Sequence, residues 1–148
     1  MVEMKKKFNW NEFDRGIFLV NVLALVYNPK TKMILIGKRK KDPYIKELSW
    51  SFPGGRPSYK EDLEKYLELE VKKKTNLGVT VKKLVFAKTY PEDRRFLSLY
   101  YIVEPKRIGK EKAGEKFVEI KWIKPMEVKK YFTTSIHPEI MKILKMLK

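Results

Sequence analysis

The chain has 148 residues, of which 35% are charged and 43% hydrophobic, and its formal net charge is +16. This is a globular composition, and the length predicts a single domain, residues 1–148, with a full hydrophobic core. The absence of cysteine excludes a disulfide framework, a thiol nucleophile and a cysteine metal site. No apolar run approaches the length of a membrane span, so we expect a cytoplasmic protein without membrane contact.

The excess of positive charge has two interpretations. Lysine and arginine number 34 against 18 acids, and glutamine is absent. A lysine-rich, glutamine-free composition resembles that of proteins from hyperthermophiles, but here the lysines are not balanced by acids. A polyanionic partner such as a nucleotide or RNA is one interpretation, and a solvated lysine surface without a specific partner is the other. Composition leaves both open.

The first third of the chain predicts strands that follow a short arm. Residues 1–14 are expected to form this arm or a short helical lead-in. Branched and large apolar residues then predict strands over 17–27 and 33–38, joined as a hairpin by the turn at 28–32. A basic loop at 39–43 precedes a short strand over 49–52.

A glycine pair and a helix follow this strand. Gly54 and Gly55 come directly after Pro53, which predicts a tight turn. Residues 59–74 lack Gly and Pro and are rich in helix-forming residues, so we expect a helix there. Asn76 and Gly78 provide its stop, since either residue tolerates a left-handed conformation.

The remaining chain predicts strands and two short helical elements. Strands are expected over 79–90, 96–103 and 117–123, with a polar loop at 106–116. Pro125 begins a helical turn, and Pro138 opens a final amphipathic helix. The pattern as a whole indicates one mixed α/β domain.

The stretch around the glycine pair resembles the Nudix superfamily. The family's box is Gly, five residues, Glu, seven residues, then Arg-Glu-apolar-any-Glu-Glu-any-Gly-apolar. Anchored on Gly55, the spacing matches at Glu61, Glu70, Val71 and Leu77. The chain departs from the box at Leu69, Lys73, Lys74 and Asn76, which replace Arg, the Glu pair and Gly. The Trp-x-Phe-Pro-Gly-Gly segment is also typical of the family, and the resemblance runs from about Ile17 to Leu147.

This resemblance implies a fold, a reaction and a cofactor. The implied fold is a Nudix-type α/β/α sandwich with a mixed sheet. The implied reaction is hydrolysis of a nucleoside diphosphate linked to another moiety, with Mg²⁺ or Mn²⁺ as cofactor. Glu70 and Glu61 are the implied catalytic residues, and Glu70 is the implied metal ligand. Divalent cations need clustered carboxylates, which residues three and four apart on one helix face can provide.

In this chain, however, that helix face carries Glu70, Lys73 and Lys74. Two ammonium groups beside a divalent cation would cost several kcal/mol. Glu70 and Lys74 have the favourable spacing for an ion pair, and Lys74 borders the apolar stripe of the helix. We therefore expect hydrolysis to be weak or absent.

Two interpretations of the lysines remain open. Lys73 and Lys74 can bind phosphate as fixed charges, making a non-catalytic nucleotide- or RNA-binding module. The residues expected to join them at the phosphate are Gly54, Gly55, Arg56, Lys38 and Arg39. In the other interpretation the lysines only pair with Glu70 and its neighbours.

Other candidates receive mostly structural interpretations. Glu61, Glu64 and Glu68 are expected on a solvated helix face, with Glu61 paired to Lys65 and Glu68 to Lys72, and metal binding by these acids is the alternative. His137 is expected to cap the last helix. A loop acid acting as base and a tyrosine stacking on a base are alternatives that the sequence leaves open; the acids are Glu92, Asp93, Glu111, Glu115 and Glu119, and the tyrosines Tyr44 and Tyr90. The basic runs at residues 5–7 and 39–41 are solvated charge or, with Phe8 and Trp10, an RNA-binding surface.

Overall fold

The computed structural model describes residues 9–40 and 49–147, and these build one mixed β-sheet. Its seven strands follow the order β3-β2-β1-β6-β5, with β4 paired to β1 and β7 to β2. Strands β1 and β6 run parallel, and the other pairs are antiparallel. The strands are β1 (Leu19–Asn28), β2 (Met33–Arg39), β3 (Trp50–Ser51), β4 (Gly54–Gly55), β5 (Val79–Tyr90), β6 (Asp93–Pro105) and β7 (Phe117–Ile123).

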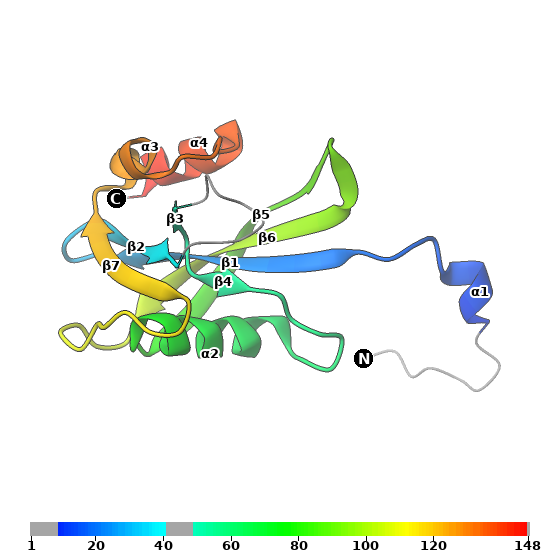
Figure 1. The fold of residues 1–148 in the computed structure, drawn as a ribbon, viewed down its shortest axis with the longest axis horizontal. Helices are drawn as coiled ribbons and strands as arrows, with labels where there is room; N and C mark the ends of the chain where they lie inside the picture. Colours follow the sequence, from blue (N-terminus) through cyan, green and yellow to red (C-terminus); the bar gives the residue numbers. More distant parts are fainter. Residues whose placement is uncertain (1–8, 41–48, 148) are drawn as a thin grey trace.

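Helices cover both faces of this sheet (Figure 1). Helix α2 (Leu63–Thr75) packs on one face, where Leu67 and Val71 contact a buried cluster that includes Val22 of β1. Helix α4 (Pro138–Met146) packs on the other, where Ile140 contacts a second cluster that includes Leu25 of β1. Successive side chains of β1 thus enter different cores, as a strand buried on both faces requires. The predicted α/β/α sandwich is confirmed.

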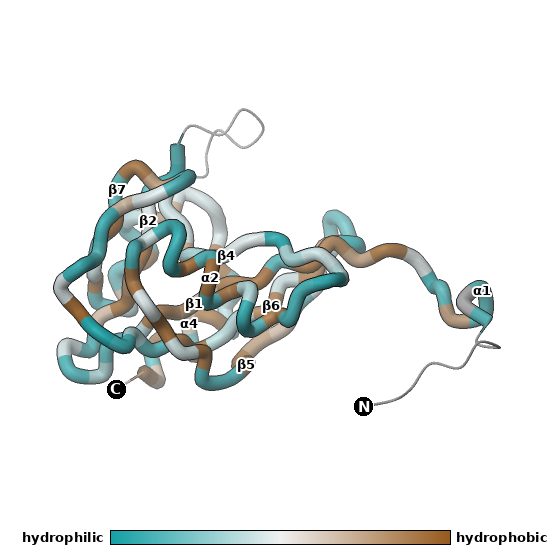
Figure 2. Tube along the Cα trace, turned by 90° about the horizontal axis from the view of Figure 1, so that it is seen from below, coloured by the Kyte–Doolittle hydropathy of each residue, from teal (hydrophilic) through white to brown (hydrophobic). Residues whose placement is uncertain are grey.

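Three shorter helical elements complete the fold. They are α1 (Trp10–Phe13), the 3₁₀ turn η1 (Pro125–Glu127) and α3 (Val128–Tyr131). Helix α1 stands away from the body of the molecule, and a hydrophobic stretch leads from it into β1 (Figures 1 and 2). Ile17 and Phe18 in this stretch are largely exposed. Among the described residues no helix is long and apolar enough to cross a membrane.

The helix after the glycine pair begins later than predicted. It starts at Leu63, because the Asp62 carboxylate accepts a 3.0 Å hydrogen bond from the backbone N–H of Lys65 and caps the first turn. Its end agrees with the prediction. Asn76 adopts a left-handed conformation with φ of 59°, and its backbone N–H donates to the carbonyl of Lys72.

The tight turn predicted at Gly54 and Gly55 is wrong. Both residues form the short strand β4, which pairs with Val22 and Leu23 of β1. They are glycines because of close approach: a Cβ on Gly54 would overlap the carbonyl oxygen of Val22, and one on Gly55 would overlap the hydroxyl of Tyr66. The pair therefore lets β4 fit between β1 and α2 without side chains of its own.

A substitution tests this close fit. We expect Gly54→Ala to lower the free energy of unfolding by about 1–3 kcal/mol, because the added methyl group must displace the backbone of β1. Gly78→Ala is the matched control, since the nearest atom to its Cβ would be 4.0 Å away. The control should change stability by less than about 1 kcal/mol. Urea unfolding of both variants gives the comparison, and equal effects would contradict this account of β4.

Candidate functional site

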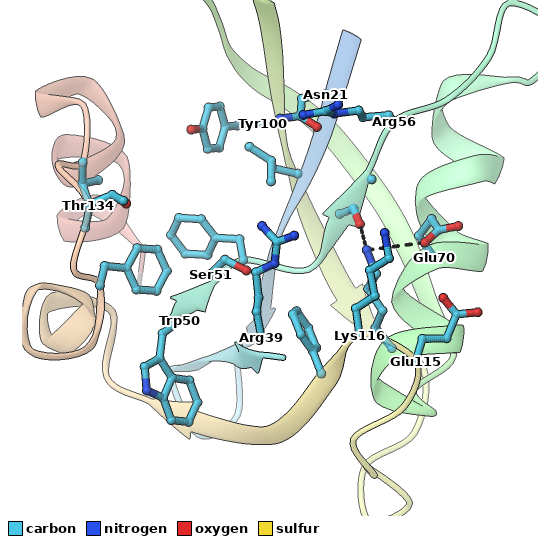
Figure 3. Close-up of a pocket in the computed structure, with 18 of the residues that line it drawn as sticks. Asn21, Arg39, Trp50, Ser51, Arg56, Glu70, Tyr100, Glu115, Lys116 and Thr134 are labelled. Carbon is cyan, nitrogen blue, oxygen red and sulfur yellow. Dashed lines mark hydrogen bonds and ion pairs between the residues drawn. The ribbon is translucent and has the colours of Figure 1, made fainter. Parts of the chain in front are cut away.

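A cavity of about 960 Å³ opens between β4, helix α2 and the segment that leads into α4 (Figure 3). Its walls come from parts of the chain that are distant in sequence. The lining includes Asn21, Arg39, Phe52, Gly54, Gly55, Arg56, Tyr66, Glu70, Lys74, Tyr90, Tyr100, Glu115, Lys116, Phe132 and His137. They divide into a charged half beside α2 and an aromatic half beside α4.

The charged half contains more cations than acids. Lys74, Lys116, Arg39 and Arg56 line it, together with the carboxylates of Glu70 and Glu115. Figure 3 shows the Arg39 side chain entering the cavity, and the Arg56 side chain lying beside Asn21. Since cations predominate, this half favours an anionic ligand.

The Lys74 ammonium group connects β4 to α2. It donates a short hydrogen bond to the carbonyl oxygen of Gly54. Its Nζ also lies 3.5 Å from a carboxylate oxygen of Glu70, which confirms the predicted ion pair. The Lys74 side chain is only 13% exposed. An ammonium group has three donors, so these two contacts leave one for a ligand.

Burial lowers the pKa of Lys74 below its ordinary value. The Glu70 carboxylate opposes this effect, while the positive charges of Lys116 and Arg39 lower the pKa further. Desolvation and neighbouring cations both disfavour the charged form of an amine. The negative charge of an anion bound beside Lys74 would favour the ammonium form and so oppose both effects.

Tyr66 closes the other side of Glu70. Burial raises the pKa of its phenol first, and the negative charges of Glu70 and Glu61 raise it further. The phenol therefore stays protonated at neutral pH. Because Gly55 has no side chain, the hydroxyl of Tyr66 and Glu70 can lie directly against β4. The Glu70 carboxylate faces the ammonium nitrogens of Lys73 and Lys74, at 3.7 and 3.5 Å.

The loop 106–116 forms one wall because it is fastened to the end of α2. The backbone N–H groups of Lys112 and Gly114 donate to the carbonyls of Thr75 and Lys74, at 2.8 and 2.9 Å. Gly114 must be glycine here, because a Cβ would overlap the carbonyl oxygen of Lys73. Glu115 follows with φ of 48°, in the left-handed region. These contacts place Glu115 and Lys116 at the cavity.

The aromatic half presents rings and hydroxyl groups. The rings of Phe52 and Phe132 meet edge to face at 4.8 Å, and Phe52 also contacts Tyr100. Tyr90 shares a 2.8 Å hydrogen bond with Ser98. Burial, and then Tyr90, raise the pKa of Tyr100. Rings with a few hydroxyls suit a flat ligand with polar edges.

The structure brings most of the sequence-predicted site residues together. Six of them line the cavity: Gly54, Gly55, Arg56, Arg39, Glu70 and Lys74. Lys38, Glu61 and Lys73 do not. Lys38 is the neighbour of Arg39 on β2 and is exposed on the opposite side of the strand. Lys73 lies outside the cavity at 3.7 Å from Glu70.

Several acids have structural roles instead. Glu61 accepts a 3.0 Å hydrogen bond from the backbone N–H of Ser58, in the turn before α2. The predicted pairs Glu61–Lys65 and Glu68–Lys72 are both wrong. Glu61 precedes the helix, and the Glu68 carboxylate accepts from the backbone N–H of Val81 at 2.9 Å. Glu111 accepts hydrogen bonds from Gly109 and from the indole N–H of Trp122. These carboxylates hold the chain in place around the site.

Some of the remaining residues at the cavity were predicted from the sequence, and others were missed. His137 caps α4, as predicted, since its Nδ1 accepts from the backbone N–H of Glu139 at 3.0 Å. Tyr90 lines the cavity, whereas Tyr44, residues 5–8 and Lys41 lie outside the described residues. Sequence reasoning missed Tyr66 and Lys116. For Tyr66 a signal existed, because it lies four residues before Glu70 on the same helix face.

The described lining of the cavity offers few of the ligands that a divalent cation prefers. Among the lining side chains that the structure describes, only Glu70 and Glu115 carry carboxylates. Within residues 9–40 and 49–147 there is no group of three or more His, Cys, Asp or Glu side chains placed to hold a metal ion. The Lys74 ammonium group already binds the oxygens of Gly54 and Glu70, the hard ligands that such a cation would need.

Comparison with solved structures identifies the architecture. Similar folds include a NUDIX hydrolase from Nitrosomonas europaea, with a TM-score of 0.73, 17% identity, and 88% of this chain and 72% of that chain covered. A MutT protein from Methanosarcina mazei Go1 has a TM-score of 0.68 and 15% identity over 88% of this chain and 95% of that one. An ADP-ribose pyrophosphatase from Streptococcus suis has a TM-score of 0.60 and 16% identity over 73% and 75%. At these identities the likeness concerns the fold.

The sequence itself adds the family. No curated protein matches the chain significantly. The family model described as NUDIX domain matches residues 18–144, which span β1 to α4 and include the whole cavity wall. Because this match covers most of the sequence, the chain belongs to the NUDIX domain family.

Proposed function

We propose that this protein binds a nucleoside phosphate in its cavity without a divalent metal, and does not hydrolyse it efficiently. The observation that carries the proposal is the position of Lys74. Its ammonium group bridges the carbonyl of Gly54 and the carboxylate of Glu70, at the edge of a cavity lined by three further cations. A fixed cation thus takes the role that an exchangeable metal ion has in the hydrolases of the family.

The replacement of a metal ion by lysine changes what the site can do. A divalent cation both attracts phosphate and lowers the pKa of a bound water molecule, which then attacks. An ammonium group provides the attraction only, because it coordinates no water that it could activate. Glu70 faces the ammonium groups of Lys73 and Lys74, so its negative charge is largely compensated. These conditions favour binding over hydrolysis.

The ligand class follows from the two halves of the cavity. Lys74, Lys116 and Arg56 favour phosphate oxygens, for which lysine serves as a point charge and arginine as a two-pronged donor. Phe52, Tyr100 and Phe132 provide surfaces for a base or sugar. A nucleoside diphosphate has both parts. One of the similar structures is described as an ADP-ribose pyrophosphatase, so ADP and ADP-ribose are the first probes.

Binding of ADP in the presence of EDTA tests the proposal. We expect titration calorimetry to detect binding that Mg²⁺ does not strengthen. Lys74→Met should weaken it by about 10- to 100-fold, because a hydrogen bond to a charged group contributes about 1.5–3 kcal/mol. Lys73→Met is the matched control: it removes the same charge one residue earlier, outside the cavity, and should change affinity less than threefold, within about 0.6 kcal/mol. Equal losses in both variants, or a strict need for Mg²⁺, would refute the proposal.

Restoring carboxylates to the helix tests the account of the metal. The double variant Lys73→Glu with Lys74→Glu would place three carboxylates on one face of α2 together with Glu70. We expect MgCl₂ to raise its melting temperature, whereas the melting temperature of the wild type stays unchanged. Lys129→Glu with Lys145→Glu makes the same change in net charge on other helices, where no acid lies three or four residues away, and should not respond.

The same proteins provide the activity test. We expect the wild type to release no product from ADP or ADP-ribose above the rate without protein, with Mg²⁺ or with Mn²⁺. Metal-dependent turnover by the wild type would show that a metal ion displaces the Lys74 ammonium group from its oxygen partners. That result would replace the binding proposal with hydrolysis.

A further inference from the structure

A row of unpaired cations lies outside the cavity, at the C-terminal end of α2. We define the basic ridge as Lys72 of this helix together with Lys106, Arg107, Lys110 and Lys112 of the loop 106–116. We propose that the basic ridge binds the phosphodiester backbone of a nucleic-acid strand. This inference does not rest on the proposed function of the cavity, since none of the five side chains lines it.

Hydrogen bonds along the loop hold the ridge together. The backbone N–H of Lys106 donates to the carbonyl of Gly78 at 2.8 Å, just beyond the helix. The side-chain amide of Asn76 donates to the carbonyl of Lys110 at 2.8 Å, and Lys112 bonds the last turn through its backbone. Figure 1 shows this loop beside the end of α2. The loop cations are therefore arranged before any ligand binds.

The ridge side chains are exposed, and their charge is not compensated. All five residues are exposed, and within residues 9–40 and 49–147 none of them makes an ion pair. Other surface lysines form ion pairs with acids: Lys82 with Glu104, and Lys142 with Glu139. The loop contains two acids: both oxygens of Glu111 already accept N–H groups, and Glu115 lies at the cavity.

A purely structural role accounts for only part of this charge. Cations stabilise the C-terminal end of a helix because they offset its dipole, and Lys72 serves this purpose by donating to the carbonyl of Asn76 at 3.4 Å. Lys73 is already paired with Glu70. Four further cations within seven residues of the loop repel one another, and a polyanion would relieve that repulsion.

The chemistry of the ridge favours nucleic acid over an anionic membrane. A surface that lies on a membrane combines cations with a broad apolar face. The loop exposes one large hydrophobic side chain, Ile108, at 50%. Four of the five cations are lysines, which act as point charges toward phosphates and do not read bases. Binding should therefore depend on salt and only weakly on sequence.

Charge reversal on the ridge tests this proposal. The ridge variant carries Lys106→Glu, Arg107→Glu, Lys110→Glu and Lys112→Glu. The matched control carries Lys60→Glu, Lys83→Glu, Lys129→Glu and Lys145→Glu, which are exposed elsewhere and make no ion pair among the described residues. Both proteins then have the same net charge. The probe is a short single-stranded RNA of mixed sequence, measured by fluorescence anisotropy at several salt concentrations, with DNA of the same sequence as a second arm.

We expect the ridge variant to lose at least about tenfold in affinity, and the slope of log affinity against log salt to shrink by roughly 3, at about 0.7 per lost phosphate contact. The control should lose far less affinity for the strand. Tighter binding of RNA than of DNA would identify RNA as the source of the backbone, and equal binding would indicate any single strand. The ADP affinity of the ridge variant should stay unchanged, which separates this proposal from that for the cavity.

Two results would overturn the inference. Equal losses in the ridge variant and the control would show that total charge alone attracts the strand. Tight, ridge-dependent binding to vesicles of anionic lipid, with weak binding to RNA and DNA, would assign the ridge to a membrane. A second ridge variant with glutamine at the same four positions guards against misfolding, since it removes the charge without adding acids and should show the same direction of change.

Discussion

The cavity depends on the contact between the short strand β4 and helix α2. Glycines at 54 and 55 bring the two backbones close enough that the Lys74 ammonium group reaches the Gly54 carbonyl. Glu70 and Tyr66 then lie directly against the strand, and the loop 106–116 docks on the helix end that follows. If β4 moved away from α2, Lys74 would lose one of its two oxygen partners and the charged half of the cavity would lose its arrangement.

Within this contact, a single side chain decides which chemistry is available. Glu70 alone cannot neutralise a divalent cation, and it already faces Lys73 and Lys74. The ammonium of Lys74 is covalently tethered, partly desolvated, and held between a carbonyl and a carboxylate. Such a charge attracts phosphate at every moment and needs no ion from solution. Unlike a divalent cation it supplies no activated water, which is the basis for proposing binding without efficient hydrolysis.

Local patterns predicted the parts of the site that lie within one element. The spacing of Glu70 and Lys74 indicated their ion pair, and the sequence after Thr75 indicated the left-handed cap at Asn76. What the sequence did not predict are contacts between distant segments. Lys74 meets Gly54 twenty positions earlier, and Lys116 reaches the cavity only because its loop docks on α2. The sequence alone suggests that Glu61 and Glu68 are solvated acids. In the structure their carboxylates accept hydrogen bonds from the backbone N–H groups of Ser58 and Val81.

Part of the strong positive charge of the chain lies on two different sides of the C-terminal half of α2. On the side toward the sheet, Lys74 is largely buried and contacts the Gly54 carbonyl and the Glu70 carboxylate at the cavity. On the outer side, the docked loop adds cations that face water without acid partners among the described residues. The two surfaces share one helix end but differ in burial, and an exposed charge is screened by salt far more than a buried one. Salt should therefore weaken binding at the basic ridge much more than binding in the cavity, so salt dependence can distinguish the two proposed activities in the wild-type protein.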